Sequence, residues 1–339
     1  MSFPALRCGA IPAFLACSLA LPVDAVVAAD GPGTGVEVQP LKSSIAEENF
    51  QTLLVMQALE DLGYTVKGIK EMDYAAGLVA LAKGDATFMA AHWDPLHIDF
   101  FDAAGGDETL SREGVYINAV LQGYLIDKET AKAHEITNIG QLKDPEVAKL
   151  FDADGNGKAD LVGCDPGWGC ANVIEYHLDA YGLRDTVEHH QDGYSALMVD
   201  TIARYQQGEP VLYYSWTPHW VSGALVPGQD VTWLQVPFSA LPGEREAVDT
   251  ALADGSNYGF PANVQRIIAN KEWTQANPAA ARLFEVMQLS SNDISAQNLQ
   301  MRDGEADEEA VKGQVQAWIE THQYAYQRWL DQARAAASQ

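Results

Sequence analysis

Short apolar runs alternate with helix-like segments from residue 36 onward, and this alternation restricts the possible folds more than any other feature of the sequence. The first strand candidates are residues 36–40, 64–66 and 87–91. Between them, helices are expected from Ser44 to Leu62 and over residues 75–83. A strand–helix–strand–helix–strand order predicts an α/β fold with a largely parallel sheet covered by helices.

Local signals mark the ends of these helices. Ser44 and Glu47 have the spacing of a capping box, which predicts that the first helix begins there. Gly63 and Gly84 follow the last apolar positions of the two helices. Glycine is favoured just after a helix, so both residues predict helix ends.

The same alternation starts again further along the chain. Its strand candidates are residues 115–126, 159–164, 210–214 and 231–236, and its helix candidates are residues 128–133, 171–181 and 194–207. A last strand candidate, residues 258–270, leads back out, and helices follow from Asn277 and over residues 308–336. This order predicts two α/β lobes joined by crossing strands, with residues 29–132 and 258–339 in lobe 1 and residues 133–257 in lobe 2. A cleft between two lobes is a common place for a small ligand.

The first 28 residues have the pattern of a secretory signal peptide. Arg7 precedes an apolar run over residues 8–23, and small residues end the segment, so the mature chain is expected to begin at Ala29. An uncleaved membrane anchor is one alternative, although the run is short for a bilayer. A lipoprotein signal with Cys17 as the lipidated residue is another. The expected location is the periplasm.

Composition excludes several classes of function. A hydrophobic content of 47% and a charged content of 20% are typical of a globular chain of 339 residues. The formal net charge of -26 disfavours binding to nucleic acid or to an anionic membrane surface. The segment after the signal peptide lacks the Walker, G-x-S-x-G and H-E-x-x-H motifs, so no cofactor is predicted.

Three tryptophans, Trp93, Trp168 and Trp216, each come just after a strand candidate. In open α/β sheets, ligands bind beyond the carboxyl ends of the strands, so the three indoles are expected to meet in one pocket. Several aromatic faces around one point suit a quaternary ammonium group, a cation without an N–H to donate. The alternative for each tryptophan alone is an ordinary core or surface position.

The segment from Cys164 to Cys170 offers donors for an anionic group. Both cysteines lie beyond the signal peptide, and two cysteines in an exported chain can form one disulfide. Glycines such as Gly169 let backbone N–H groups approach a ligand closely. The N–H groups of Gly169 and Cys170, with His97 as a further donor, would hold a carboxylate. A purely structural disulfide and a structural histidine remain the alternatives.

An Asp/Asn-rich segment resembles the first part of a calcium loop. Asp152, Asp154, Asn156 and Asp160 space oxygen ligands suitably, but Gly163 occupies the position where an EF-hand needs a bidentate Glu. Calcium binding is therefore one interpretation, and a solvated turn is the other.

Long stretches of the chain resemble the periplasmic glycine betaine/proline betaine-binding proteins of osmoprotectant ABC importers. The resemblance runs from about Gly35 to the C-terminal helix, and its most specific segments are residues 48–55 (ENFQTLLV), 84–88 (GDATF), 122–128 (QGYLIDK), 164–170 (CDPGWGC) and 233–243 (WLQVPFSALPG). It implies a type II periplasmic-binding fold whose two lobes close on the ligand. It also implies a membrane permease as partner and no enzymatic activity, and we expect a monomer.

The same resemblance implies a role for each candidate residue. Trp93, Trp168 and Trp216 would surround the trimethylammonium group, and His97 with the N–H groups of Gly169 and Cys170 would hold the carboxylate. Cys164 and Cys170 would be paired. Two residues beside the site, His92 and Asp94, depart from the expected pattern, and Asp94 could tune the ligand preference toward cations.

Two competing functions follow from the same residues. Choline, carnitine or another quaternary amine could be the preferred ligand. A different class is an exported enzyme with Cys170 as nucleophile and His97 as base, which requires a free thiol.

Overall fold

The computed structural model describes residue 1 and residues 31–191, 193–302, 304 and 307–338. Nearly all of the predicted signal peptide, including Cys17 and the proposed cleavage site, lies outside the described residues. Within the described part of the chain, no helix is both long and apolar enough to span a membrane.

Twelve strands are present among the described residues. They are β1 (Glu37–Val38), β2 (Pro40–Lys42), β3 (Thr65–Val66), β4 (Lys70–Glu71), β5 (Phe88–Asp94), β6 (Leu110–Ser111), β7 (Ile117–Asp127), β8 (Ala159–Val162), β9 (Val187–His190), β10 (Leu212–Thr217), β11 (Val231–Leu234) and β12 (Asn263–Asn270). All three tryptophan-bearing segments follow or end strands of this set.

The α-helices cover both faces of the sheets. They are α1 (Glu48–Asp61), α2 (Tyr74–Lys83), α3 (Ile98–Ala103), α4 (Lys128–Ala133), α5 (Pro145–Ala148), α6 (Gly169–Ala180), α7 (Tyr194–Gln206), α8 (Val221–Ala224), α9 (Lys271–Ala276), α10 (Pro278–Val286), α11 (Ser291–Arg302), α12 (Glu308–Thr321) and α13 (Gln323–Ala336). Short 3-10 turns at Gly106–Glu108, Ile139–Lys143, Lys149–Phe151 and Gly243–Arg245 complete the order.

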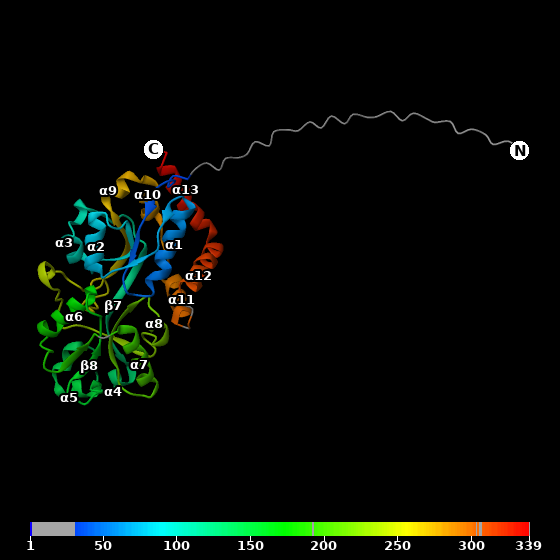
Figure 1. The fold of residues 1–339 in the computed structure, drawn as a ribbon. Coiled ribbons are helices and arrows are strands. Elements are labelled where there is room, and N and C mark those ends of the chain that lie inside the picture. Colours follow the sequence, from blue (N-terminus) through cyan, green and yellow to red (C-terminus); the bar gives the residue numbers. More distant parts are fainter. Residues whose placement is uncertain (2–30, 192, 303, 305–306, 339) are drawn as a thin grey trace. The chain divides into compact units, whose positions relative to one another are not determined.

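Strand β7 connects two halves of the sheet. The order is β4-β2-β5-β12-β7-β10-β8-β9, with β11 also on β7 and β6 on β12. The first residues of β7, Ile117 and Val120, pair with β12, whereas Leu121 to Ile126 pair with β10. We call the half with β2, β4, β5 and β12 lobe 1, and the half with β8 to β11 lobe 2. Figure 1 shows α1, α2, α9, α10 and α12 around lobe 1 and α4 to α7 around lobe 2.

The prediction of a largely parallel sheet was correct only for the outer strands. β2 pairs in parallel with β4 and β5, and β8 pairs in parallel with β9 and β10. The central pairs β5–β12, β12–β7 and β7–β10 are antiparallel. The reason is that β7 and β12 cross between the lobes in opposite directions. Each of them is therefore antiparallel to the strands beside it.

Most helix boundaries agree with the sequence signals, but the capping box was wrong. α2 ends at Gly84, which has a φ of 78° as a C-terminal glycine should. α1 begins at Glu48 and has no side-chain cap, because the Ser44 hydroxyl and the Glu47 carboxylate have long-range partners instead. The C-terminal helical stretch is divided into α12 and α13 at His322.

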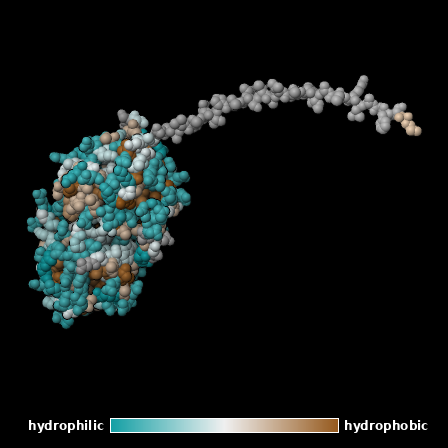
Figure 2. Space-filling model, in the orientation of Figure 1, coloured by the Kyte–Doolittle hydropathy of each residue, from teal (hydrophilic) through white to brown (hydrophobic). Residues whose placement is uncertain are grey.

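The surface of the protein is mostly polar on the face that Figure 2 shows. Figure 2 shows a mostly hydrophilic face, on which apolar side chains form only scattered spots. Large apolar side chains are instead concentrated in one core cluster that runs through both lobes.

Candidate functional site

A small cavity lies between the two lobes. Its lining residues come from lobe 1, from lobe 2 and from β7, and they are Ile45, Tyr74, Trp93, Leu96, His97, Gln122, Trp168, Gly169, Cys170, Tyr214 and Trp216. The structure thus brings all six predicted ligand-binding residues to one place, although they come from three separate segments of the sequence.

Three buried indoles form the walls at one end of the cavity. Trp216, near the end of β10, is the central wall. The ring of Trp93, near the end of β5, lies 6.1 Å from that of Trp216 at 87°, and the ring of Trp168 lies 5.9 Å from it at 79°. Rings at such angles present several aromatic faces to one small volume. This arrangement suits a cation without hydrogen-bond donors.

Backbone donors lie at the start of α6. Trp168 is the N-cap residue and Gly169 and Cys170 begin the helix, so their N–H groups have no acceptor within the helix. The positive end of the helix dipole adds to the attraction for an anion. Cys170 forms a disulfide with Cys164, as the resemblance implied, and this bond joins the helix start to the end of β8. The disulfide also removes the free thiol that a cysteine-dependent enzyme would need.

His97 contributes a third donor. Its Nδ1 atom accepts a hydrogen bond of 3.3 Å from the backbone N–H of Trp93. Burial lowers the pKa of His97 well below its usual value, so the ring is neutral and its proton is on Nε2. A Cβ atom on Gly169 would lie 3.0 Å from Cδ2 of His97, so ring and helix start are in close contact. Donors from both lobes therefore lie close to one another in the cavity wall.

Sequence reasoning missed five residues of the cavity wall, which are Ile45, Tyr74, Leu96, Gln122 and Tyr214. Tyr74 packs on His97 with a ring distance of 4.0 Å, and no local pattern indicates this contact. Tyr214 precedes Trp216 by two residues on β10, so the strand period could have placed it on the same face. Gln122 is the register partner of Trp216 and accepts a hydrogen bond from the Tyr214 hydroxyl.

The two residues that depart from the family pattern lie outside the cavity wall. Asp94 forms ion pairs of 3.0 Å with Arg112 and 2.7 Å with Arg266. Its charge is therefore compensated by the protein, and an effect of Asp94 on the ligand preference stays a prediction. His92 is buried, and burial followed by the charge of Arg112 lowers its pKa to about 3.

The possible calcium loop is a hydrogen-bonded turn. Carboxylate oxygens of Asp152, Asp154 and Asp160 lie within 4.8 Å of one another. However, Asp152 accepts bonds from three backbone N–H groups of the turn, and both oxygens of Asp160 have protein partners. Asn156 also accepts a backbone bond. Calcium binding stays a prediction, and the hydrogen bonds explain the motif without it.

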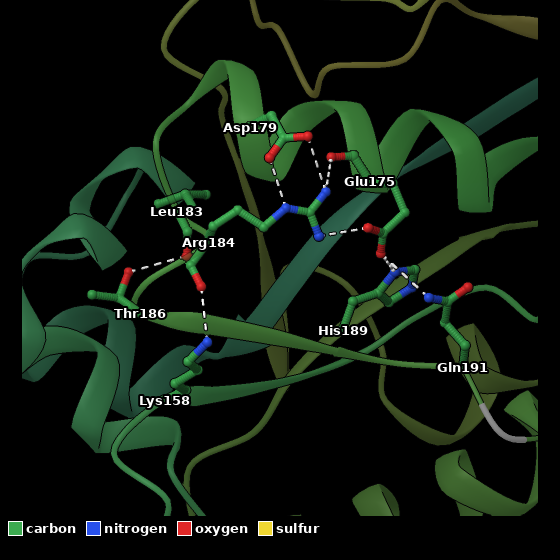
Figure 3. A network of polar contacts seen from close by, with 8 residues as sticks. All are labelled: Lys158, Glu175, Asp179, Leu183, Arg184, Thr186, His189 and Gln191. Atoms are coloured by element: carbon green, nitrogen blue, oxygen red, sulfur yellow. Dashed lines mark hydrogen bonds and ion pairs between the residues drawn. The ribbon is translucent and has the colours of Figure 1, made fainter.

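A network of hydrogen bonds and ion pairs joins α6 to β9, as Figure 3 shows. Glu175 of α6 binds His189 of β9 at 2.8 Å and also pairs with Arg184. The other ring nitrogen of His189 faces Gly163, where a Cβ atom would lie only 2.1 Å away. The network thereby holds α6 against the segment that leads into the disulfide loop.

Comparisons with known proteins show the family of this chain. A family model for the substrate-binding domain of ABC-type glycine betaine transport systems matches residues 37–320. The chain belongs to this family. Members are solute-binding domains of transport systems, so this chain is a binding protein and not an enzyme.

Relatives within this family cover nearly the whole chain. The glycine betaine-binding periplasmic protein OusX of Dickeya dadantii is 55% identical over 325 residues, 96% of this chain and 98% of the relative. The glycine betaine/proline betaine-binding periplasmic protein of Escherichia coli is 57% identical over 309 residues, 91% of this chain and 93% of the relative.

Solved structures support the two-lobed fold of the family. A glycine betaine/L-proline-binding protein from Borrelia burgdorferi has a TM-score of 0.70 at 16% identity, over 89% of this chain and 99% of the other. A lactococcal binding protein in its closed form with glycine betaine has a TM-score of 0.65 at 19% identity, over 87% of this chain and 99% of the other.

Proposed function

We propose that the chain is the periplasmic solute-binding component of an ABC importer and that it captures glycine betaine, or the related proline betaine, for osmoprotection. The observation that carries this proposal is one cavity lined both by three indoles and by the residues that offer N–H donors. Glycine betaine is a quaternary ammonium joined to a carboxylate, so its two groups match the two kinds of residue in the cavity wall. The names of the relatives in Dickeya and Escherichia support the same ligand class.

The trimethylammonium group would bind between Trp93, Trp168 and Trp216. Each contact of a desolvated cation with an aromatic face contributes about 2 kcal/mol. The carboxylate would accept bonds from Nε2–H of His97 and from the N–H groups of Gly169 and Cys170. Charge-assisted bonds of this kind contribute roughly 1.5–3 kcal/mol each.

Binding would couple to closure of the lobes. Trp93 and His97 belong to lobe 1, whereas Trp168, Gly169, Cys170 and Trp216 belong to lobe 2, so only the closed arrangement brings every group to the ligand. We place residues 29–132 and 258–339 in lobe 1 and residues 133–257 in lobe 2. The closed form of a monomer would then dock on the permease. Cleavage of the signal peptide would release the mature chain into the periplasm.

Calorimetric titration of the mature protein with glycine betaine, choline and L-proline tests the proposal. Tight binding of glycine betaine and weak binding of the other two are expected, because only glycine betaine has both a quaternary ammonium and a carboxylate. Tighter binding of choline would assign the site to a cationic amine. No binding of glycine betaine to protein with an intact disulfide would overturn the ligand assignment.

A further inference from the structure

A carboxylate lies buried behind the indole walls. Glu48, the first residue of α1, is only 1% exposed. Four donors converge on it: the N–H and hydroxyl of Ser43 on Oε2, and the Tyr74 hydroxyl and the Trp93 indole N–H on Oε1. The Trp93 contact is 3.5 Å long. No part of the proposed site assigned above uses this residue.

A single layer of side chains separates Glu48 from the cavity. Both partners of its Oε1 atom, Trp93 and Tyr74, line the cavity wall. Tyr74 also packs on His97, so the carboxylate contacts one cage residue directly and is separated from His97 by the Tyr74 ring. A charge at this position acts on the cavity through a thin layer of aromatic atoms with little water between.

The surroundings of Glu48 favour the ionised form but leave its charge without a protein cation. Each of its neighbours donates a hydrogen bond, which suits a carboxylate rather than a carboxylic acid. Burial acts in the opposite direction and raises the pKa of Glu48 above its usual value. The hydrogen-bond partners described above, Ser43, Tyr74 and Trp93, are all uncharged donors. A buried anion is costly unless a cation approaches it.

We propose that Glu48 is a specificity-determining residue, whose buried negative charge selects ligands with a positive charge at the end held by the indoles. This inference rests on the proposed function and adds a second basis for selectivity. The aromatic cage alone accepts an apolar group of the same shape through dispersion and burial. The carboxylate behind the cage discriminates against such a group, because only a cation compensates the charge.

A pair of ligands that differ only in this charge isolates the effect. Glycine betaine and tert-butylacetate have the same shape, since a tert-butyl group replaces trimethylammonium in the second. Their dissociation constants are measured by calorimetry at several pH values from about 7 to about 9, because burial raises the pKa of Glu48 and a higher pH favours its ionised form. The wild-type protein is compared with Glu48→Gln, and with Glu60→Gln as a control because Glu60 is an exposed glutamate on the same helix.

We expect Glu48→Gln to reduce the preference for glycine betaine over tert-butylacetate by at least about tenfold, and Glu60→Gln to leave it unchanged. If Glu48 had only a structural role, Glu48→Gln would weaken the binding of both ligands by the same factor. Equal weakening, or unchanged binding of glycine betaine, would overturn the inference. If Glu48→Gln does not fold, the same ratio is compared between Ser43→Ala and the double variant Ser43→Ala/Glu48→Gln, in which the new amide no longer meets the Ser43 hydroxyl.

The wild-type titration separates this inference from the proposed function. Failure of the wild-type protein to bind glycine betaine overturns the function itself. Binding by the wild type with an unaltered ratio in Glu48→Gln overturns only the role of Glu48.

Discussion

Glu47 and His219 are in contact across the two lobes, with Nε2 of His219 3.3 Å from Oε1 of Glu47. Glu47 precedes α1 in lobe 1, and His219 follows β10 in lobe 2. The ring of His219 also packs on Trp216, with ring centres 4.0 Å apart. This contact therefore joins the lobes directly behind the central wall of the cavity.

Removal of this contact should weaken ligand binding. In His219→Ala, the closed arrangement loses a buried hydrogen bond to a carboxylate and the packing behind Trp216. Such bonds contribute about 1.5–3 kcal/mol, so calorimetry should show affinity for glycine betaine reduced by roughly tenfold or more. His134→Ala, at an exposed histidine, is the control. Equal affinities of the two variants would show that the contact does not contribute to closure.

The same pair predicts a dependence of stability on pH. Burial raises the pKa of Glu47, but the hydrogen bond and charge of His219 outweigh it and hold the pKa below 4.5. Because the folded-state value is the lower one, the stabilisation is present above the unfolded value and is lost as the pH falls through the folded value. Thermal unfolding should show wild type more stable than Glu47→Gln at about pH 6, with a smaller difference at about pH 3. A difference that stays constant over this range would contradict the assignment.

The three indoles should not be equivalent. Trp216 touches both Trp93 and Trp168, whereas Trp93 and Trp168 each touch Trp216 at one side of the cage. Trp168→Ala should weaken binding of glycine betaine by roughly tenfold, and Trp216→Ala should weaken it further because the other two rings lose their support. Fluorescence or calorimetric titration measures both, with Tyr324→Ala as a surface aromatic control. Unchanged affinity in either tryptophan variant would remove the cage from the account.

Two glycine-to-alanine substitutions should affect different properties, the first ligand affinity and the second stability. In Gly169→Ala, the new methyl group would lie 3.0 Å from both His97 and Leu96, so it displaces donors at the carboxylate end. Affinity for glycine betaine should fall by about tenfold or more. In Gly313→Ala, within α12, the methyl group meets nothing within 4 Å. This variant should keep its affinity and gain up to about 1 kcal/mol of stability in thermal or urea unfolding. Unchanged binding by Gly169→Ala would contradict the proposed carboxylate position.

Asp94 should affect stability and not ligand preference. Asp94→Asn leaves the guanidinium groups of Arg112 and Arg266 without their shared carboxylate. Urea unfolding should show a loss of about 1–3 kcal/mol, because both hydrogen-bonded charge pairs are partly buried. The ratio of affinities for glycine betaine and choline should stay at the wild-type value. A change in that ratio would show that Asp94 influences the ligand preference.

The sequence by itself determined the α/β class, most helix ends and the six candidate ligand-binding residues. Alternating patterns and glycine signals act over a few residues, so they are visible without a fold, as the end of α2 at Gly84 illustrates. The tryptophans could be grouped because each is close to the end of a strand, and the two remaining cysteines had only each other as partners. The long segments that resemble binding proteins supplied the roles.

Only the tertiary structure decided which groups support the site. Tyr74, Gln122 and Tyr214 reach the cavity through packing between segments that are remote in sequence. The prediction of a capping box was wrong for the same reason. Residues of a local pattern can instead bind partners from distant parts of the chain. Glu47 contacts His219 of the other lobe rather than the start of its own helix. Likewise the antiparallel course of β7 and β12 depends on how the lobes connect, because strand direction is set by pairing over long distances and not by the residues of one strand.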